Sequence, residues 1–229
     1  MCFNITSSLI MTIIGVALSV YCYYKINFLV AFGIFYFTLM QIIHVLGYLV
    51  INKCGNKLNS SLAYVNYIHI AFQPFIFTIM IFGLLQFYNL TDIKYSNFKY
   101  VIILSFIASL FMLSRLWGKP GLGCDLCGLK PCVKSGKHHI TIQTPLRTKP
   151  EYFTPTFFIH FLFFFIPICF LGAWGIGISA FILISFILLI NILGVSPTEG
   201  STIWCLASIA QFLFVIIFVT LFGNKANKK

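Results

Sequence analysis

Charged residues are scarce in this chain. Only 8% of its 229 residues are Asp, Glu, Lys or Arg, and 60% are hydrophobic, whereas about a quarter of the residues of an ordinary soluble domain are charged. The composition therefore excludes an ordinary soluble domain and predicts an integral membrane protein.

Motifs that would identify a particular chemistry are also missing. The chain has no HExxH, no GxSxG and no phosphate-cradling glycine loop, so the common metalloprotease, hydrolase and nucleotide-binding signatures give no help. The last apolar stretch has no internal lysine for a retinal, and the DRY-like and NPxxY-like signatures of G-protein-coupled receptors are absent. Ceramidase-like hydrolases carry a histidine pair in their last span, where this chain reads "STIWCLASIAQF".

Long apolar stretches dominate what is present. A helix needs roughly 20 apolar residues to cross a bilayer core, and seven such stretches occur, with the glycine-rich "GAWGIG" dividing the fifth from the sixth. We therefore expect an all-α fold, a single polytopic domain over residues 1–229 built as a bundle of seven transmembrane helices. The expected spans are 7–24, 28–51, 62–86, 99–117, 156–173, 178–195 and 202–222.

Seven crossings would place the two termini on opposite sides of the membrane. We call the side that holds Met1 the N-face; it receives the connections 52–61, 118–155 and 196–201. Nine of the fifteen Lys and Arg residues fall on this face and six on the other. Because these residues favour the cytoplasmic side, we expect a cytoplasmic N-terminus, although three of the opposing six lie together in the C-terminal tail.

Polar side chains recur at matched depths near the N-face. His44 and His69 each lie seven residues from the N-face end of their spans, which at 1.5 Å per residue is roughly 10 Å below the surface. Gln41 and Gln73 follow one helical turn deeper on the same stripes. The two spans are joined by a short connection and should be antiparallel neighbours. We expect a histidine pair above a glutamine pair.

This cluster could bind a ligand, hold a metal or simply tie helices together. With Glu199, Trp204 and Gln211 from the last span it forms the candidate ligand-binding set. A zinc-type ion takes three protein ligands plus water when it is catalytic, and neutral histidines with amides could instead bind a polar headgroup or act as a base. Interhelical hydrogen bonds, each about 0.6 kcal/mol on average, are the structural alternative. The possible metal ligands are His44, His69, His160, Cys2 and Cys205.

The basic loop 118–155 contains a second group of possible ligands. Cys124, Cys127, Cys132 and His138 have the types and spacings of a small tetrahedral zinc site. Disulfide pairing and free thiols are the alternatives, and disulfides would require an oxidising face. The basic residues of the loop should lie against anionic lipid headgroups, so lipid is the expected partner and nucleic acid is not.

Three segments carry a family resemblance. "MCFNITSS", "YIHIAFQPF" and "EGSTIWCLASIAQ" resemble a family of uncharacterised multi-pass membrane proteins that begin with Met-Cys-Phe and occur in large DNA viruses and some bacteria. The resemblance implies a multi-pass topology and no established activity. From the residues we expect a site that binds, and could modify, a membrane-dissolved or lipid-like small molecule. A transporter or channel, which needs a polar path through the whole membrane, and a purely structural or partner-binding protein are the alternatives.

Overall fold

The computed structural model describes residues 4–87, 94–117, 129–147, 157–170, 173–194 and 197–226. These residues form seven α-helices and a two-stranded antiparallel sheet. The elements are α1 (Ile5–Lys25), α2 (Phe28–Leu49), α3 (Lys57–Phe87), α4 (Lys94–Ser114), β1 (Cys132–Ser135), β2 (Ile140–Gln143), α5 (Phe157–Cys169), α6 (Ala173–Leu193) and α7 (Pro197–Ala226).

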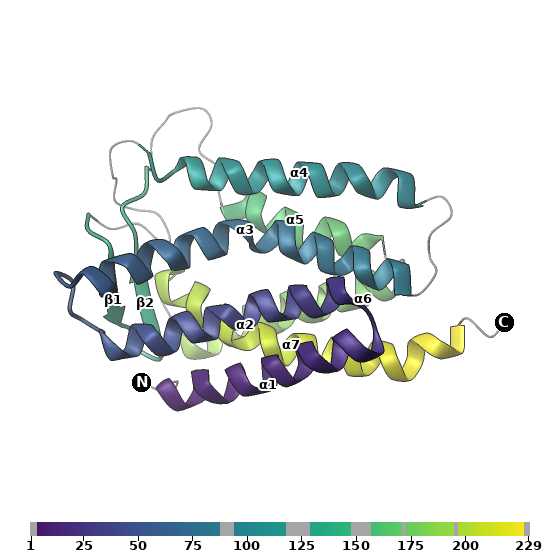
Figure 1. Ribbon diagram of the computed structural model, residues 1–229, viewed down its shortest axis with the longest axis horizontal. Coiled ribbons are helices and arrows are strands. Elements are labelled where there is room, and N and C mark those ends of the chain that lie inside the picture. Colours follow the sequence, from purple (N-terminus) through teal and green to yellow (C-terminus); the bar gives the residue numbers. More distant parts are fainter. Residues whose placement is uncertain are drawn as a thin grey trace.

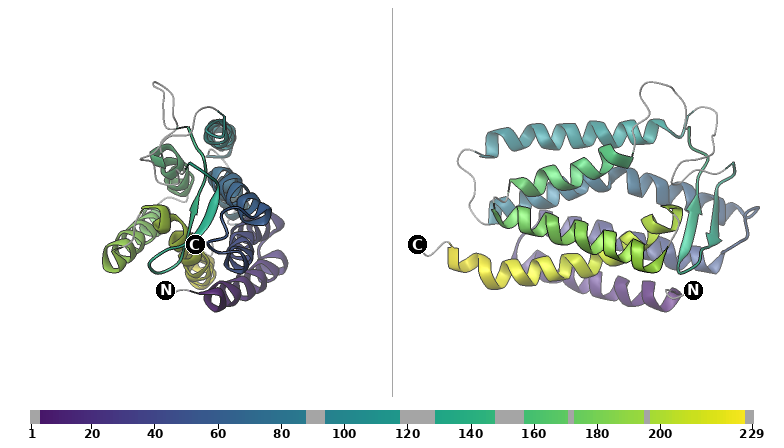
Figure 2. Two further views of the ribbon diagram at one scale, coloured as in Figure 1. Left: turned by 90° about the vertical axis from the view of Figure 1, so that its left-hand side faces the viewer. Right: turned by 180° about the vertical axis from the view of Figure 1, so that it is seen from behind.

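The helices lie side by side and alternate in direction (Figure 1). The start of α1, the α2–α3 connection and both strands share one end of the bundle, which we call the hairpin end; it corresponds to the N-face. The α1–α2 turn and the end of α7 lie at the opposite end. Seen from its own end, the hairpin crosses the middle of the bundle (Figure 2).

Four of the described helices are long and apolar enough to cross a membrane, judged by length and composition: α1, α2, α3 and residues Asn97–Ser114 of α4. Residues Thr202–Ile217 of α7 form a shorter apolar helix. Each of the seven expected spans falls on one helix. That all seven cross a membrane stays a prediction.

α4 exposes several large apolar side chains and buries two small polar ones. Its large apolar side chains Ile103 and Leu104 are each 53% exposed, while Ser105 and Ser109 are buried. In water, the exposed apolar side chains of this helix would be unfavourable. In hydrocarbon they contact lipid favourably, and the small polar residues allow close packing between helices. The same kind of exposed apolar face occurs on α1 and α6.

Side-chain caps and one small residue fix the packing of the first three helices. Asn27 caps α2 through its Oδ1, which accepts from the Val30 amide, and its Nδ2 donates to the Gly83 carbonyl of α3 at 2.6 Å. Gly33 of α2 lies against Met80 of α3, where an added Cβ would come within 2.6 Å of the Met80 Cβ. The two helices therefore approach closely over much of their length.

The hairpin corrects the expectation of an all-α chain. β1 and β2 pair in register from Cys132 with Gln143 to Ser135 with Ile140, and Val133, Ile140 and Ile142 join the core of the bundle. Strands of four residues carry too little period-two pattern to be recognised in a loop. They form here because the end of the bundle provides the apolar surface that one face of the hairpin needs.

Candidate functional site

Three helices meet at Cys205. Gln41 of α2 donates its Nε2–H to the Cys205 carbonyl at 2.7 Å, and Gln73 of α3 places its Nε2 3.5 Å from the Cys205 sulfur. All three residues are buried. The glutamine pair expected from the sequence thus converges on α7, on a residue that the sequence had suggested only as a metal ligand.

His69 is held by its neighbours in one tautomer. Its Nε2 lies 2.7 Å from the Tyr36 carbonyl, which can only accept, so Nε2 carries the hydrogen. The opposite ring nitrogen, Nδ1, then accepts from Gln73 at 3.4 Å. The Tyr36 ring stacks on the imidazole with a centroid distance of 4.1 Å, and its hydroxyl donates to the His69 carbonyl. His69 therefore ties α2 to α3.

A buried carboxylate attaches the hairpin to α7. Glu199, in the first turn of α7, is 2% exposed, and its oxygens accept from three successive backbone amides, those of Lys137, His138 and His139. Consecutive amides of a tight turn form a concave anion-binding surface. Thr202, one turn further along α7, donates to the Ile140 carbonyl at 2.6 Å. These bonds fix the turn of the hairpin above the helix start.

His139, at the end of this turn, contacts two residues of α2. Its Nε2 lies 3.3 Å from Nδ1 of His44, and its Nδ1 lies 2.7 Å from the hydroxyl of Tyr48. His44 and His139 are fully buried, and Tyr48 is partly exposed. A chain of three titratable groups therefore runs from the edge of the hairpin end to the interior.

This chain can carry its hydrogens in either direction. If Tyr48 donates to His139, then His139 donates to His44 Nδ1, and Nε2 of a neutral His44 carries a hydrogen. If His44 donates through Nδ1, the hydrogens of the chain point toward Tyr48, and His44 Nε2 becomes an acceptor. The inner nitrogen of His44 can thus present a donor or an acceptor without any change in net charge.

Several interior polar atoms have no hydrogen-bond partner among the described residues. On α2 and α3 they are Nε2 of His44, Oε1 of Gln41, and both side-chain polar atoms of Asn66; Ser8 Oγ, Thr141 Oγ1 and Arg147 Nε lie elsewhere in the chain. His44 and Gln41 lie three residues apart on one face of α2, and Asn66 lies on the α3 stripe that continues through His69 to Gln73. All three residues are no more than 1% exposed. They lie between the level of Cys205 and the hairpin.

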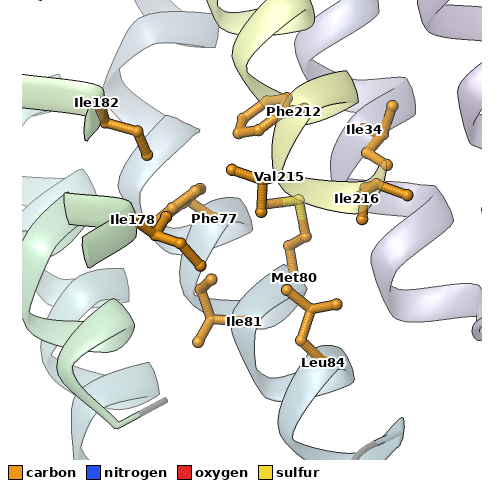
Figure 3. A pocket seen from close by; sticks show the side chains of 10 residues that line it. All are labelled: Ile34, Phe77, Met80, Ile81, Leu84, Ile178, Ile182, Phe212, Val215 and Ile216. Atoms are coloured by element: carbon orange, nitrogen blue, oxygen red, sulfur yellow. The ribbon is translucent and has the colours of Figure 1, made fainter. Parts of the chain in front are cut away.

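A small cavity in the other half of the bundle is lined only by apolar side chains. Figure 3 shows this cavity between α2, α3, α6 and α7. All side-chain atoms drawn there are carbon except the sulfur of Met80. Its free volume is about 20 Å³, little more than the roughly 10–15 Å³ that one water needs, and an apolar void of this size stays dry. The ten residues are Ile34, Phe77, Met80, Ile81, Leu84, Ile178, Ile182, Phe212, Val215 and Ile216.

The remaining candidates from the sequence have other surroundings. Gln211 donates to the Ser185 hydroxyl of α6 at 2.7 Å, and Trp204 packs edge-on against Phe164 of α5. Gln211 therefore links α7 to α6, and Trp204 links α7 to α5. Cys2 and the side chain of His160 lie outside the described residues.

The described residues contain no group of three or more His, Cys, Asp or Glu side chains that could hold a metal ion. The expected zinc site of the bundle is therefore not supported by them. Cys132 of the expected loop site is bonded to Cys54 as a disulfide, so its sulfur is not available as a thiolate ligand. The ring of His138 binds the Leu193 carbonyl at the end of α6. Cys124 and Cys127 lie outside the described residues, and a zinc site that includes them stays a prediction.

His139, Tyr48 and Asn66 were not among the sequence candidates. His139 follows His138 directly, but nothing in the local sequence indicates that the loop folds back onto α2. Asn66 could have been found, because it precedes His69 by three residues and so continues the polar stripe of α3.

Comparisons with known proteins assign the chain to a family but do not indicate an activity. A family model described as a family of unknown function (DUF5765) matches residues 6–225. No curated protein and no solved structure matches the chain. The match agrees with the resemblance to an uncharacterised family, whereas the viral and bacterial distribution suggested by that resemblance stays a prediction.

Proposed function

The chain belongs to this family of unknown function, and from its geometry we propose an integral membrane protein that binds a small polar molecule, or the polar head of a lipid-like one, at the hairpin end. In this proposal all seven helices cross the membrane. The ligand-binding residues are Gln41, His44 and Asn66.

The observation that carries the proposal is the set of unpartnered atoms on these three residues. A buried donor or acceptor left without a partner costs about 1–3 kcal/mol, and an unsatisfied buried group in a native structure calls for an explanation such as a bound water or ligand. A ligand that offers at least one donor and one acceptor would satisfy them. In hydrocarbon the penalty for leaving them unpaired is greater still.

The His139–His44 chain supports a chemical role in addition to binding. Because His44 Nε2 can act as donor or acceptor, it can adapt to a hydroxyl, an amide or a carbonyl on the ligand. A base that relays a proton through His139 to Tyr48 at the edge of the bundle would need this arrangement. Modification of the ligand therefore belongs to the proposal as an extension of the binding role.

The apolar lining of the cavity in the other half of the bundle favours a one-sided site over a transporter. A transport path that continued from Cys205 through the small cavity of Figure 3 would meet no hydrogen-bonding side chain among the residues that line it. A purely structural role would explain the bonds of His69 and Gln73, but it leaves the unpartnered atoms of His44, Gln41 and Asn66 without a reason.

The binding proposal can be tested by analysing molecules that co-purify with the protein. Wild-type protein and Asn66→Leu should be purified in mild detergent, extracted with organic solvent and compared by mass spectrometry. We expect a polar or amphiphilic species near one equivalent per wild-type chain and at least a tenfold reduction in the variant. Thr78→Val is the matched control, because Thr78 is also a buried polar residue of α3 but its hydroxyl already bonds the Pro74 carbonyl. Equal amounts in wild type and Asn66→Leu would contradict the proposal.

A further inference from the structure

The α2–α3 connection and the hairpin are joined covalently at the hairpin end. Cys54 follows α2 and Cys132 begins β1; they are 78 residues apart in sequence and form a disulfide. Their Cα atoms are 4.9 Å apart, within the usual disulfide range of about 4.4–6.8 Å. Cys132 is buried and Cys54 is partly exposed.

Hydrogen bonds hold the same two segments in position independently of the sulfurs. Asn59 of α3 donates to the carbonyls of Val50 and Val133 and accepts from the Val133 amide. Asn52 donates its amide to the Val133 carbonyl and accepts from the Ser135 amide through its side chain. The φ of Asn52 is 63°, a conformation that Asn tolerates better than most residues. The cysteine pair therefore lies in an ordered junction.

We infer that the hairpin end of the bundle faces an oxidising, extracytoplasmic compartment. Forming the bond removes two protons and two electrons from the two thiols, and a disulfide of the oxidising compartment accepts them and becomes a dithiol. Such bonds persist outside the cytosol and are rare within it, where thioredoxin and glutathione keep thiols reduced. The orientation is opposite to the one expected from counting all Lys and Arg residues.

The charge distribution agrees with this orientation once the folded hairpin is considered separately. Six of the nine basic residues of the N-face belong to the loop 118–155, part of which forms the ordered hairpin. Long loops and folded domains are translocated largely regardless of their charge. Apart from this loop, the N-face carries only Lys53, Lys57 and Arg115, against six basic residues on the opposite face. The shorter connections thus place the opposite face in the cytoplasm.

The orientation determines from which side a ligand reaches the site. The chain from Tyr48 through His139 to His44 starts at the hairpin end, so a ligand would enter from the extracytoplasmic side or the adjoining leaflet. This consequence rests on the proposed function, whereas the orientation rests only on the disulfide and the charges.

The orientation is tested first by the thiol state in living cells. Cells producing the full chain are quenched in acid and treated with a maleimide before and after dithiothreitol, and each cysteine is scored by peptide mass. We expect Cys54 and Cys132 to react only after reduction, whereas the exposed thiol of Cys169 reacts without it and serves as the internal control. Alkylation of Cys54 and Cys132 before reduction would overturn the inference.

The sidedness is measured with two added cysteines. Lys57→Cys lies at the hairpin end and Lys25→Cys at the opposite end, and both positions are exposed. In intact cells a membrane-impermeant maleimide should modify Lys57→Cys at least tenfold more than Lys25→Cys, and permeabilisation should abolish the difference. Preferential modification of Lys25→Cys would contradict the orientation even if the disulfide is present. Neither experiment depends on ligand binding, so the orientation can fail while the proposed function stands, and the reverse also holds.

Discussion

The imidazoles of His139 and His44 lie 3.3 Å apart between Nε2 and Nδ1, although 95 residues separate them in the chain. His44 belongs to α2, while His139 is the last residue of the hairpin turn before β2. The contact depends on Glu199, which binds the backbone amides of that turn. An acidic residue of α7 therefore determines the surroundings of a histidine in α2.

Replacing Glu199 by Gln should loosen the hairpin. An amide offers one acceptor oxygen and places an NH₂ group against three backbone donors, so bonds to a charged acceptor worth about 1.5–3 kcal/mol are weakened. We expect the amides of Lys137 to His139 to exchange with deuterium at least tenfold faster, measured by mass spectrometry. Gln143→Ala, which removes a side-chain bond from Lys134 in the same hairpin, is the control. Unchanged exchange in Glu199→Gln would show that the carboxylate does not hold the turn.

Gly136→Ala should disturb the same turn by steric means. An added Cβ would lie 2.5 Å from the His139 carbonyl oxygen and 2.7 Å from the Glu199 carboxyl carbon. Overpacking of this kind costs typically about 1–3 kcal/mol, so the thermal midpoint in detergent should fall. Gly55→Ala is the matched control, since nothing lies within 4 Å of its added Cβ. A midpoint lowered equally by both substitutions would remove the steric explanation.

Tyr48→Phe tests the hydrogen-bonded chain. The substitution removes the hydroxyl that lies 2.7 Å from His139 Nδ1, so the tautomer balance of His139, and through it that of His44, should change. The imidazole ¹⁵N chemical shifts of both residues report this balance. Tyr36→Phe on the same helix loses its bond to the His69 carbonyl and should leave the His139 signals in place. Identical His139 signals in wild type and Tyr48→Phe would contradict the chain.

The close approach of α2 and α3 predicts an intolerance at Gly33. Its added Cβ would lie 2.6 Å from the Met80 Cβ, and separating the two helices would also separate Gln41 from Gln73. We expect Gly33→Ala to lower stability by about 1–3 kcal/mol, measured by unfolding in mixed detergent. Gly177→Ala, which meets nothing within 4 Å, should change stability little. A Gly33→Ala protein as stable as the wild type would show that the interface can readjust.

The helices could be anticipated from the sequence because each apolar stretch is longer than 15 residues and its composition alone defines it. Helical spacing also predicted that Gln41 and Gln73 lie on the stripes of His44 and His69, but it did not predict that both contact Cys205 of α7. His139 could not be anticipated in the same way. Its position depends on Glu199, Asn59 and Cys54, which are distant in sequence and come together only when the hairpin packs on the finished bundle.

Metal ligands were the least predictable part. Cys132 has zinc-like spacing to Cys124 and Cys127, and spacing alone does not distinguish a zinc ligand from a half-cystine. Cys54, the disulfide partner of Cys132, precedes it by 78 residues, and helices α3 and α4 lie between the two in the chain. The choice between the two chemistries depends on tertiary contact and on the redox state of the compartment.

The most direct measurement is a high-resolution experimental structure of the protein purified from its membrane. We predict density for a bound molecule larger than water within hydrogen-bond distance of His44 Nε2 and the Asn66 side chain, with Gln41 Oε1 as a further partner. A map in which these atoms bond only to one another, to protein groups or to a single water would contradict the binding site proposed for this protein.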